Sequence, residues 1–453
     1  MRNAKHTKRN GKRGLALLLG ALIMLAPLSS LATGDLAVDF VGVISDKNTT
    51  YSDTPTVNVP EGGFPENEWV DGINPLTGEP WAGIYQPIFV SVDTDPRARP
   101  NFGVSDADVI YELPLHRQGN TRSIALFMST LPTAGAGPVR SARIPMVDVA
   151  EEWGAGYVFF GMQEQKGTSV KEHIKNLHRD AIEESGTGRA LVTTTNYPYL
   201  DLMGAKFNEF NERSSHPAPH NVICNVADLV ATFGKDPPKM RPWKFSEQGL
   251  DRGASALSVE MRFRPDWIPT FLYNAQTRSY DRYYNGEPFV DANNNRLCTY
   301  ANVIVMRTDV SWYRNNPSRP IVKLTGQGVA DFFMNGRYIR GSWVRAMSNN
   351  DGNEKTSLAA RTVFLDENGQ EMTFLPGKTF IHVVAADTMV IIGNDPAVGD
   401  AIDNPQPVPT PKPTKTPKPT RTPRPTRTPK PGAETPPPML PIEDDFEIIL
   451  PDD

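Results

Sequence analysis

The sequence contains very little cysteine: Cys224 and Cys298 are its only two thiols in 453 residues. No C-x-x-C pair and no Cys/His spacing of a zinc or iron–sulfur site occurs, so the sequence predicts no metal site and no cofactor. His216 and His220 have the spacing of paired helical ligands, but the prolines between them exclude the helix that such a pair would need. The two cysteines either close one disulfide or remain separate buried thiols, and the sequence leaves both alternatives open.

The sequence also lacks the G-x-S-x-G turn of serine hydrolases, so Ser141 is a poor candidate for a nucleophile. Outside its two ends the chain has no excess of positive charge. Of 47 basic and 52 acidic side chains, residues 1–13 hold six of the basic ones and residues 410–453 hold seven of each kind, which leaves 34 basic against 45 acidic. A body with this negative balance does not attract a phosphodiester backbone, which excludes nucleic acid as a partner.

The N-terminal segment 1–32 has the form of an export signal. Six basic residues and no acid in residues 1–13 precede an apolar run at 14–26, and small residues follow at 29–32. The sequence therefore predicts an extracytoplasmic protein of the cell envelope. Cleavage near Thr33 would give a secreted protein, whereas retention would give a membrane anchor, because residues 14–32 are long enough to span a bilayer. No cysteine follows the apolar run, so no lipid attachment is predicted there.

The C-terminal segment 403–453 is rich in proline and basic residues and ends in acidic ones. Residues 410–431 read TPKPTKTPKPTRTPRPTRTPKP, with a basic side chain at every third position. This spacing predicts a polyproline II rod, whose threefold turn places seven cations along one edge. We expect the whole segment to pack against nothing, because its low apolar content cannot offset the entropy of ordering. The cations either keep a linker soluble or bind an anionic envelope polymer, a lipid surface or an acidic envelope protein.

Between these two ends the sequence predicts three parts. Residues 33–86 lack sustained apolar periodicity and are expected to form an extended stalk. Residues 87–235 predict a mixed α/β domain, with strands at 88–92, 108–112, 123–128 and 157–160 and helices at 145–153 and 169–176. Residues 250–395 predict a β-rich domain, because Asn-Gly pairs at 285, 335 and 368 separate strand-like runs. The predicted fold class is α+β.

Several blocks of the chain resemble one family. QPIFVSVDTDPRARPNFGVSDADVIYELPL, TRSIALFMS and GPVRSARIPMVDVAEEWGAGYVF, followed by PHN at 219–221, are similar to the N-terminal domain of the YerB-like family of bacterial lipoproteins. GQGVADFFMNGRYIRGSW and LPGKTFIHVV resemble its C-terminal domain. The resemblance implies an extracytoplasmic location and an α+β fold with a β-rich partner domain, and it implies no reaction. Two features depart from the family pattern: the lipid-carrying cysteine is absent, and residues 116–120 read HRQGN where the family has an acid before a glycine pair.

The same blocks contain the candidate ligand-binding residues. Residues 137–143 lead directly into the predicted helix at Pro145, and arginines beside a helix N-terminus bind phosphate or carboxylate. The predicted site consists of Arg122, Arg140, Ser141, Arg143 and Asn221. In the alternative interpretation, Arg140 and Arg143 form structural ion pairs with the acids at positions 93, 95, 106 or 112.

A catalytic alternative depends on three acids at the ends of predicted strands, Asp93, Asp95 and Glu112. Paired carboxylates can act as acid and base on a glycan, although strand-end acids are also common turn residues. Aromatic residues of the second domain, Trp312 and Trp343 among them, either line a carbohydrate surface or pack in the core. We favour an exported envelope protein that binds a ligand or serves as a scaffold. The alternative is an enzyme that acts on cell-wall glycan.

Overall fold

The computed structural model describes residues 40–44, 57, 59–60, 63–177, 199–203, 211–230, 240–345 and 360–393. The predicted export signal and C-terminal segment lie outside these ranges, as does part of the predicted stalk. By its internal contacts the chain divides into residues 1–404 and 405–453, and every described residue belongs to the first part. Among the described residues, no helix is both long enough and apolar enough to cross a membrane.

One mixed sheet of eleven strands contains strands from both predicted domains. Its members are β2 (Ile88–Val92), β3 (Val109–Pro114), β4 (Thr121–Phe127), β5 (Gly156–Phe159), β6 (Tyr199–Asp201), β10 (Ala254–Ser255), β16 (Asn302–Thr308), β19 (Gly326–Met334), β20 (Arg337–Arg345), β21 (Thr362–Leu365) and β23 (Thr379–Ala385). The strand order is β10-β20-β19-β16-β23-β3-β4-β2-β5-β6, and β21 pairs with β20. The parallel neighbours β3 and β23, with Val109 opposite Thr379, join the two sequence segments in this sheet.

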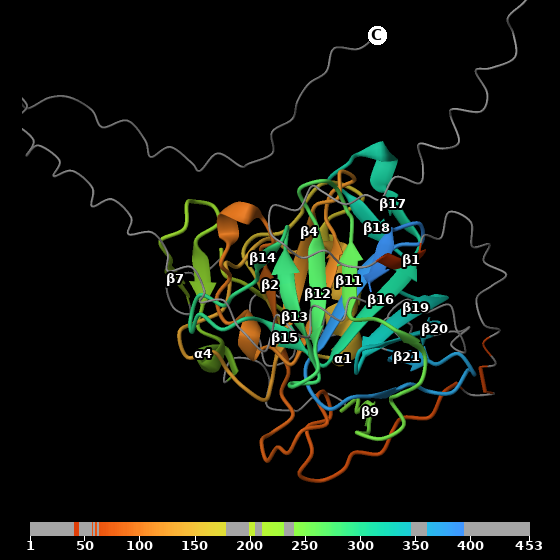
Figure 1. Cartoon of the computed structure of the whole chain (residues 1–453). Coiled ribbons are helices and arrows are strands. Elements are labelled where there is room, and N and C mark those ends of the chain that lie inside the picture. Colours follow the sequence, from red (N-terminus) through yellow and green to blue (C-terminus); the bar gives the residue numbers. More distant parts are fainter. Residues whose placement is uncertain are drawn as a thin grey trace, which may run out of the picture. The chain divides into compact units, whose positions relative to one another are not determined.

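A second sheet of seven strands packs on one face of the first. It follows the order β1 (Phe40–Ile44), β24 (Val390–Gly393), β11 (Ser258–Met261), β12 (Pro269–Asn274), β13 (Ser279–Tyr284) and β14 (Glu287–Pro288), with β15 (Thr299–Tyr300) paired to β13. Figure 1 shows β11, β12 and β13 side by side. The rings of Phe271 in β12 and Phe380 in β23 lie 5.4 Å apart between the two sheets. An apolar layer therefore joins the sheets face to face.

Two helices cover the opposite face of the first sheet. Val109 and Tyr111 of β3 pack with residues of α1 (Ile144–Trp153) and α2 (Val170–Leu177), whereas Ile110 faces the second sheet. Because both faces are covered, β3 and β4 are buried along almost their whole length, including the polar residues Glu112, Thr121, Arg122 and Ser123. The described residues also form the short α-helix α4 (Val226–Val230) and the strand pairs β7 (Asn211–Arg213) with β8 (Val222–Cys224), β17 (Val310–Trp312) with β18 (Pro320–Val322), and β9 (Lys244–Phe245) with β22 (Thr373–Phe374).

The local predictions from turn and cap residues are confirmed. The helix at 145–153 ends at Gly154, whose φ of 56° allows its N–H to donate to Ala150 O and Glu151 O. Asn335 and Gly336, with φ of 50° and 67°, connect β19 to β20, as the Asn-Gly signal predicts. The fold class is confirmed only in its coarser form. Among the described residues strands far outnumber helices, so the fold is mostly β rather than an even α+β mixture.

The two cysteines are separate thiols. Cys224 and Cys298 are both buried and unbonded, and burial raises the pKa of each thiol to about 12. Of the two open alternatives, the structure therefore has free cysteines held in apolar surroundings. The aromatic residues divide as well: Trp343 is fully buried in the core, whereas Trp312 is only half-buried.

Candidate functional site

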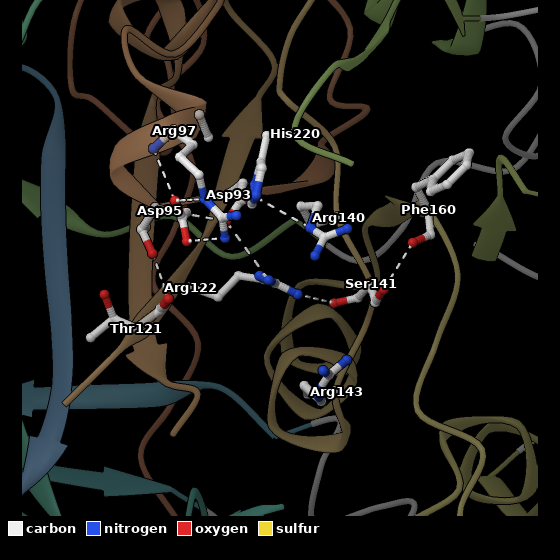
Figure 2. Close-up of polar contacts among 12 residues, drawn as sticks. Asp93, Asp95, Arg97, Thr121, Arg122, Arg140, Ser141, Arg143, Phe160 and His220 are labelled. Carbon is white, nitrogen blue, oxygen red and sulfur yellow. Dashed lines mark hydrogen bonds and ion pairs between the residues drawn. The ribbon is translucent and has the colours of Figure 1, made fainter. Parts of the chain in front are cut away.

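The candidate site is centred on Asp93, which follows the last residue of β2. In the antiparallel β2–β4 pair Val92 lies opposite Ser123, so the next register position brings Asp93 beside Arg122. Arg122 Nη2 lies 3.8 Å from Asp93 Oδ1, and Arg140 Nε lies 3.2 Å from Asp93 Oδ2. His220 Nδ1 lies 2.6 Å from the same Oδ2 atom. Figure 2 shows these three side chains around the carboxylate.

The charges at this position do not balance. Burial would raise the pKa of Asp93, but the hydrogen bond with His220 and the guanidinium groups of Arg122 and Arg140 hold this pKa well below its usual value. Burial lowers the pKa of Arg122 to about 9, with Arg140 and Arg143 acting in the same direction and Asp93 opposing them. Asp93 and Arg122 are therefore both charged at neutral pH, and the guanidinium groups of Arg122 and Arg140 share this one carboxylate among their contacts with the described residues. We call Asp93, Arg122, Arg140, Arg143 and His220 the Asp93 cluster.

Ser141 holds the guanidinium of Arg122, and Arg143 stands at the start of α1. Arg122 Nη1 donates to Ser141 O over 3.0 Å, and Ser141 Oγ donates to Phe160 O over 3.0 Å. Arg143 is the N-cap residue of α1, and no side chain caps this helix end. Pro145 has no N–H, and the N–H groups of Met146 and Val147 both donate to Arg143 O. The helix therefore contributes the positive end of its dipole more than a set of open N–H donors, and the arginines provide most of the positive potential.

Several buried polar atoms of the cluster have no hydrogen-bond partner among the described residues. They are Arg122 Nε, Arg140 Nε and His220 Nε2. Arg140 Nε is close to Asp93 but outside hydrogen-bond geometry. The buried hydroxyl groups of Tyr157 and Ser91 lie close to each other, also without reaching that geometry. Because an unsatisfied buried donor or acceptor costs about 1–3 kcal/mol, such a concentration points to a ligand or bound water.

The three acids of the catalytic alternative have separate partners. Asp95 pairs with Arg97 at 3.0 Å, and Glu112 pairs with Arg282 at 2.9 Å inside the core. Burial opposes the shift of Asp95, yet the hydrogen bonds from Arg97 lower its pKa. Since Asp93 and Asp95 both have lowered pKa values, neither is suited to donate a proton at neutral pH. Asp106 pairs with Arg296 at 2.9 Å. Of the ion pairs predicted between Arg140 or Arg143 and these acids, the structure contains the one between Arg140 and Asp93.

The structure adds His220 to the residues found by sequence reasoning. The sequence argues only against a helical metal pair of His216 with His220, and it predicts the neighbouring Asn221 as a ligand-site residue. Asn221 is half-buried, and its backbone carbonyl accepts from the N–H of Ser214 over 2.8 Å. Asp93 and His220 are 127 positions apart, and neither a local pattern nor charge spacing connects them. The PHN block was the available signal for His220, because it lies within the resemblance.

Comparisons with known proteins cover both halves of the chain. Residues 76–239 match the N-terminal domain described as "Protein of unknown function (DUF3048)", and residues 259–381 match the C-terminal domain of the same description. "Putative lipoprotein YerB" of Bacillus subtilis (strain 168) is 23% identical over 320 residues, which cover 68% of this chain and 85% of that protein. The crystal structure of YerB protein from Bacillus subtilis is similar with a TM-score of 0.54 and 21% identity, over 70% of this chain and 99% of that chain. The fold is thus shared, and the whole Asp93 cluster lies inside the matched N-terminal domain.

Proposed function

The chain belongs to this two-domain family of proteins of unknown function, and from that membership and the Asp93 cluster we propose that it is an extracytoplasmic protein that binds an anionic ligand. Two observations support the location. The relative from Bacillus subtilis bears the name of a lipoprotein, and residues 1–32 of this chain have the charge and apolar pattern of an export signal. Because the lipid-carrying cysteine is absent here, the apolar segment itself serves as a cleaved signal or as the anchor.

The observation that carries the binding proposal is the excess of positive charge at Asp93, where two guanidinium groups, those of Arg122 and Arg140, share one carboxylate. Arg122 is 4% exposed, and Arg140 and Arg143 are only half-buried, so the cluster reaches from the core to the surface. Guanidinium groups in such a position bind oxyanions through charge-assisted hydrogen bonds. Binding is favoured over glycan hydrolysis because the cluster contains one carboxylate, held ionised, whereas hydrolysis needs a second carboxyl group that can donate a proton.

Thermal unfolding in the presence of phosphate tests this proposal. Phosphate that binds the folded state alone is expected to raise the melting temperature in proportion to its occupancy. Arg140→Ala removes one of the half-buried cations and is expected to abolish most of that rise. Arg296→Ala is the matched control, because Arg296 is 64% exposed and pairs with Asp106 outside the cluster. Equal phosphate-induced shifts in both variants would contradict binding at this site.

For the C-terminal segment we propose a second, weaker contact with the envelope. The seven cations of residues 410–431 are spaced for multivalent binding to an anionic polymer or lipid surface, while the acidic body is repelled by it. Replacing all seven by glutamine and keeping every proline removes the charge without changing chain length. The variant is expected to leave purified envelopes at much lower salt than the unmodified protein, because screening weakens such contacts when the Debye length falls to about 8–10 Å.

Co-sedimentation with envelopes over a series of salt concentrations measures this difference. The same replacement in a protein without residues 1–32 separates retention by the tail from retention by the apolar N-terminal segment. If the glutamine variant and the unmodified protein remain with the envelopes equally at low salt, the tail is only a spacer.

A further inference from the structure

The hydrogen bond between His220 and Asp93 determines which ring nitrogen carries the proton. Asp93 is ionised and accepts, so Nδ1, at 2.6 Å from Asp93 Oδ2, must donate. A neutral imidazole that donates through Nδ1 has its lone pair on Nε2. The Asp93 cluster therefore has a hydrogen-bond acceptor of its own beside the guanidinium donors.

This acceptor is buried and unsatisfied. His220 is 3% exposed, and Nε2 has no hydrogen-bond partner among the described residues. The imidazole and the guanidinium of Arg140 contact the same carboxylate oxygen, at 2.6 and 3.2 Å, so the ring and this guanidinium lie side by side at Asp93. Figure 2 shows the ring and the two guanidinium groups on the sides of Asp93. A ligand complementary to this arrangement accepts from the arginines and donates to Nε2.

We propose that His220 Nε2 selects oxyanions that carry a hydroxyl group, so that the site takes hydrogen phosphate or a phosphate ester with a neighbouring hydroxyl and rejects sulfate. The inference rests on the proposed anion-binding function and names its ligand class. Hydrogen phosphate has a P–OH group that can donate to Nε2, and a polyol phosphate offers an alcohol O–H for the same purpose. Sulfate has a similar size and charge, but at neutral pH all of its oxygens are acceptors.

The arginines alone cannot make this distinction, because a guanidinium group donates equally well to phosphate and sulfate oxygens. Against sulfate, Nε2 would face another acceptor and would gain no donor from the ligand. Buried polar groups that lose their partner in this way are the strongest source of discrimination between ligands of equal size. The discrimination therefore depends on the tautomer of His220 and, through it, on Asp93.

Calorimetric titration of the whole protein with inorganic phosphate, sulfate and glycerol 3-phosphate, at one ionic strength and neutral pH, tests the proposal. The unmodified protein is expected to bind phosphate at least tenfold more tightly than sulfate. His220→Phe keeps a ring of similar size but removes the acceptor, so it is expected to bind the two anions with a ratio near one. Tighter binding of glycerol 3-phosphate than of phosphate assigns the ester as the natural class, and the reverse order assigns the free anion.

Asp93→Asn provides a second variant that acts through the tautomer. An amide at position 93 can donate to Nδ1, which moves the ring proton to Nε2 and converts the acceptor into a donor. The loss of one negative charge raises the affinity for both anions, but the phosphate-to-sulfate ratio is expected to fall below one. Melting temperatures without added anion verify that each variant is folded.

The outcomes separate the two proposals. If the unmodified protein binds phosphate and sulfate equally, the role of His220 is overturned while anion binding stands, and this result needs no variant. A preference for phosphate that survives in both folded variants, His220→Phe and Asp93→Asn, also overturns the role of His220. If none of the three anions binds, the proposed function itself fails.

Discussion

Replacing Arg282 by methionine is expected to lower the free energy of unfolding by about 3–5 kcal/mol, because it leaves the carboxylate of Glu112 buried without its partner. The two side chains are 3% and 0% exposed, with Arg282 Nη2 at 2.9 Å from Glu112 Oε2. The guanidinium also lies 4.0 Å from the ring centre of Phe289 and 4.5 Å from that of Phe380. Since Glu112 belongs to β3 and Arg282 to β13, the pair ties the two sheets together at their apolar interface.

Two further variants show whether the loss of stability comes from the buried ion pair. Arg296→Met breaks an ion pair whose arginine is 64% exposed, and it is expected to cost less than about 1 kcal/mol. A double variant, Arg282→Met with Glu112→Met, removes both charges and is expected to recover most of the loss, since an apolar pair needs no counter-charge. Urea unfolding gives the three values. A cost for Arg282→Met as small as that for Arg296→Met would show that Glu112 reaches water or another partner.

Sequence reasoning succeeded where the signal is local. The strand at 88–92, the helix at 145–153 with Gly154 beyond its end, and the Asn335–Gly336 hairpin were all predicted from a few neighbouring residues. Each depends on backbone preferences that act within one turn or one strand. Both predicted helices are present, but strands far outnumber helices among the described residues, because periodicity does not show how many strands a sheet recruits.

The long-range arrangement could not be predicted in this way. The parallel pairing of β3 with β23 joins residues from the two ends of the body, and only the packing of both faces selects it. The candidate site has the same property. The arginines were identified from their density in the sequence, but their common carboxylate and the acceptor on His220 follow from tertiary contacts. Charge balance inside a fold is known only when the partner of each charge is known.

His382 is expected to make the protein less stable as the pH falls below about 6.5. The ring belongs to β23 and lies 4.5 Å from that of Phe380 and 5.6 Å from that of Phe271, and it is fully buried. Burial, followed by the positive charge of Arg282, places the pKa of His382 well below its ordinary value of 6.5. The unfolded chain therefore binds a proton in this pH range that the folded protein does not. The contribution of neutral His382 to the free energy of unfolding is therefore complete above about pH 6.5. It falls on acidification by up to about 1.4 kcal/mol per pH unit.

The variant His382→Phe places an apolar ring among those of Phe263, Phe271 and Phe380 and cannot titrate. Between about pH 7 and pH 5 it is expected to lose about 2 kcal/mol less than the unmodified protein in urea unfolding. His116→Asn serves as the control, because His116 is half-buried and its pKa is lowered by burial and by Arg264. The control variant is expected to change the pH dependence of the free energy of unfolding much less than His382→Phe does.

Parallel stability curves for the unmodified protein and His382→Phe would contradict this account. They would mean that the folded protein accepts an imidazolium at position 382 at little cost. Among the described residues, the one carboxylate in reach is that of Glu112, whose Oε2 lies 3.9 Å from His382 Nδ1 and already pairs with Arg282. Two cations would then share one buried carboxylate, and Arg282→Met should make the His382 site easier to protonate. Measuring the pH dependence of Arg282→Met therefore distinguishes a histidine kept neutral by burial from one kept neutral by the neighbouring guanidinium.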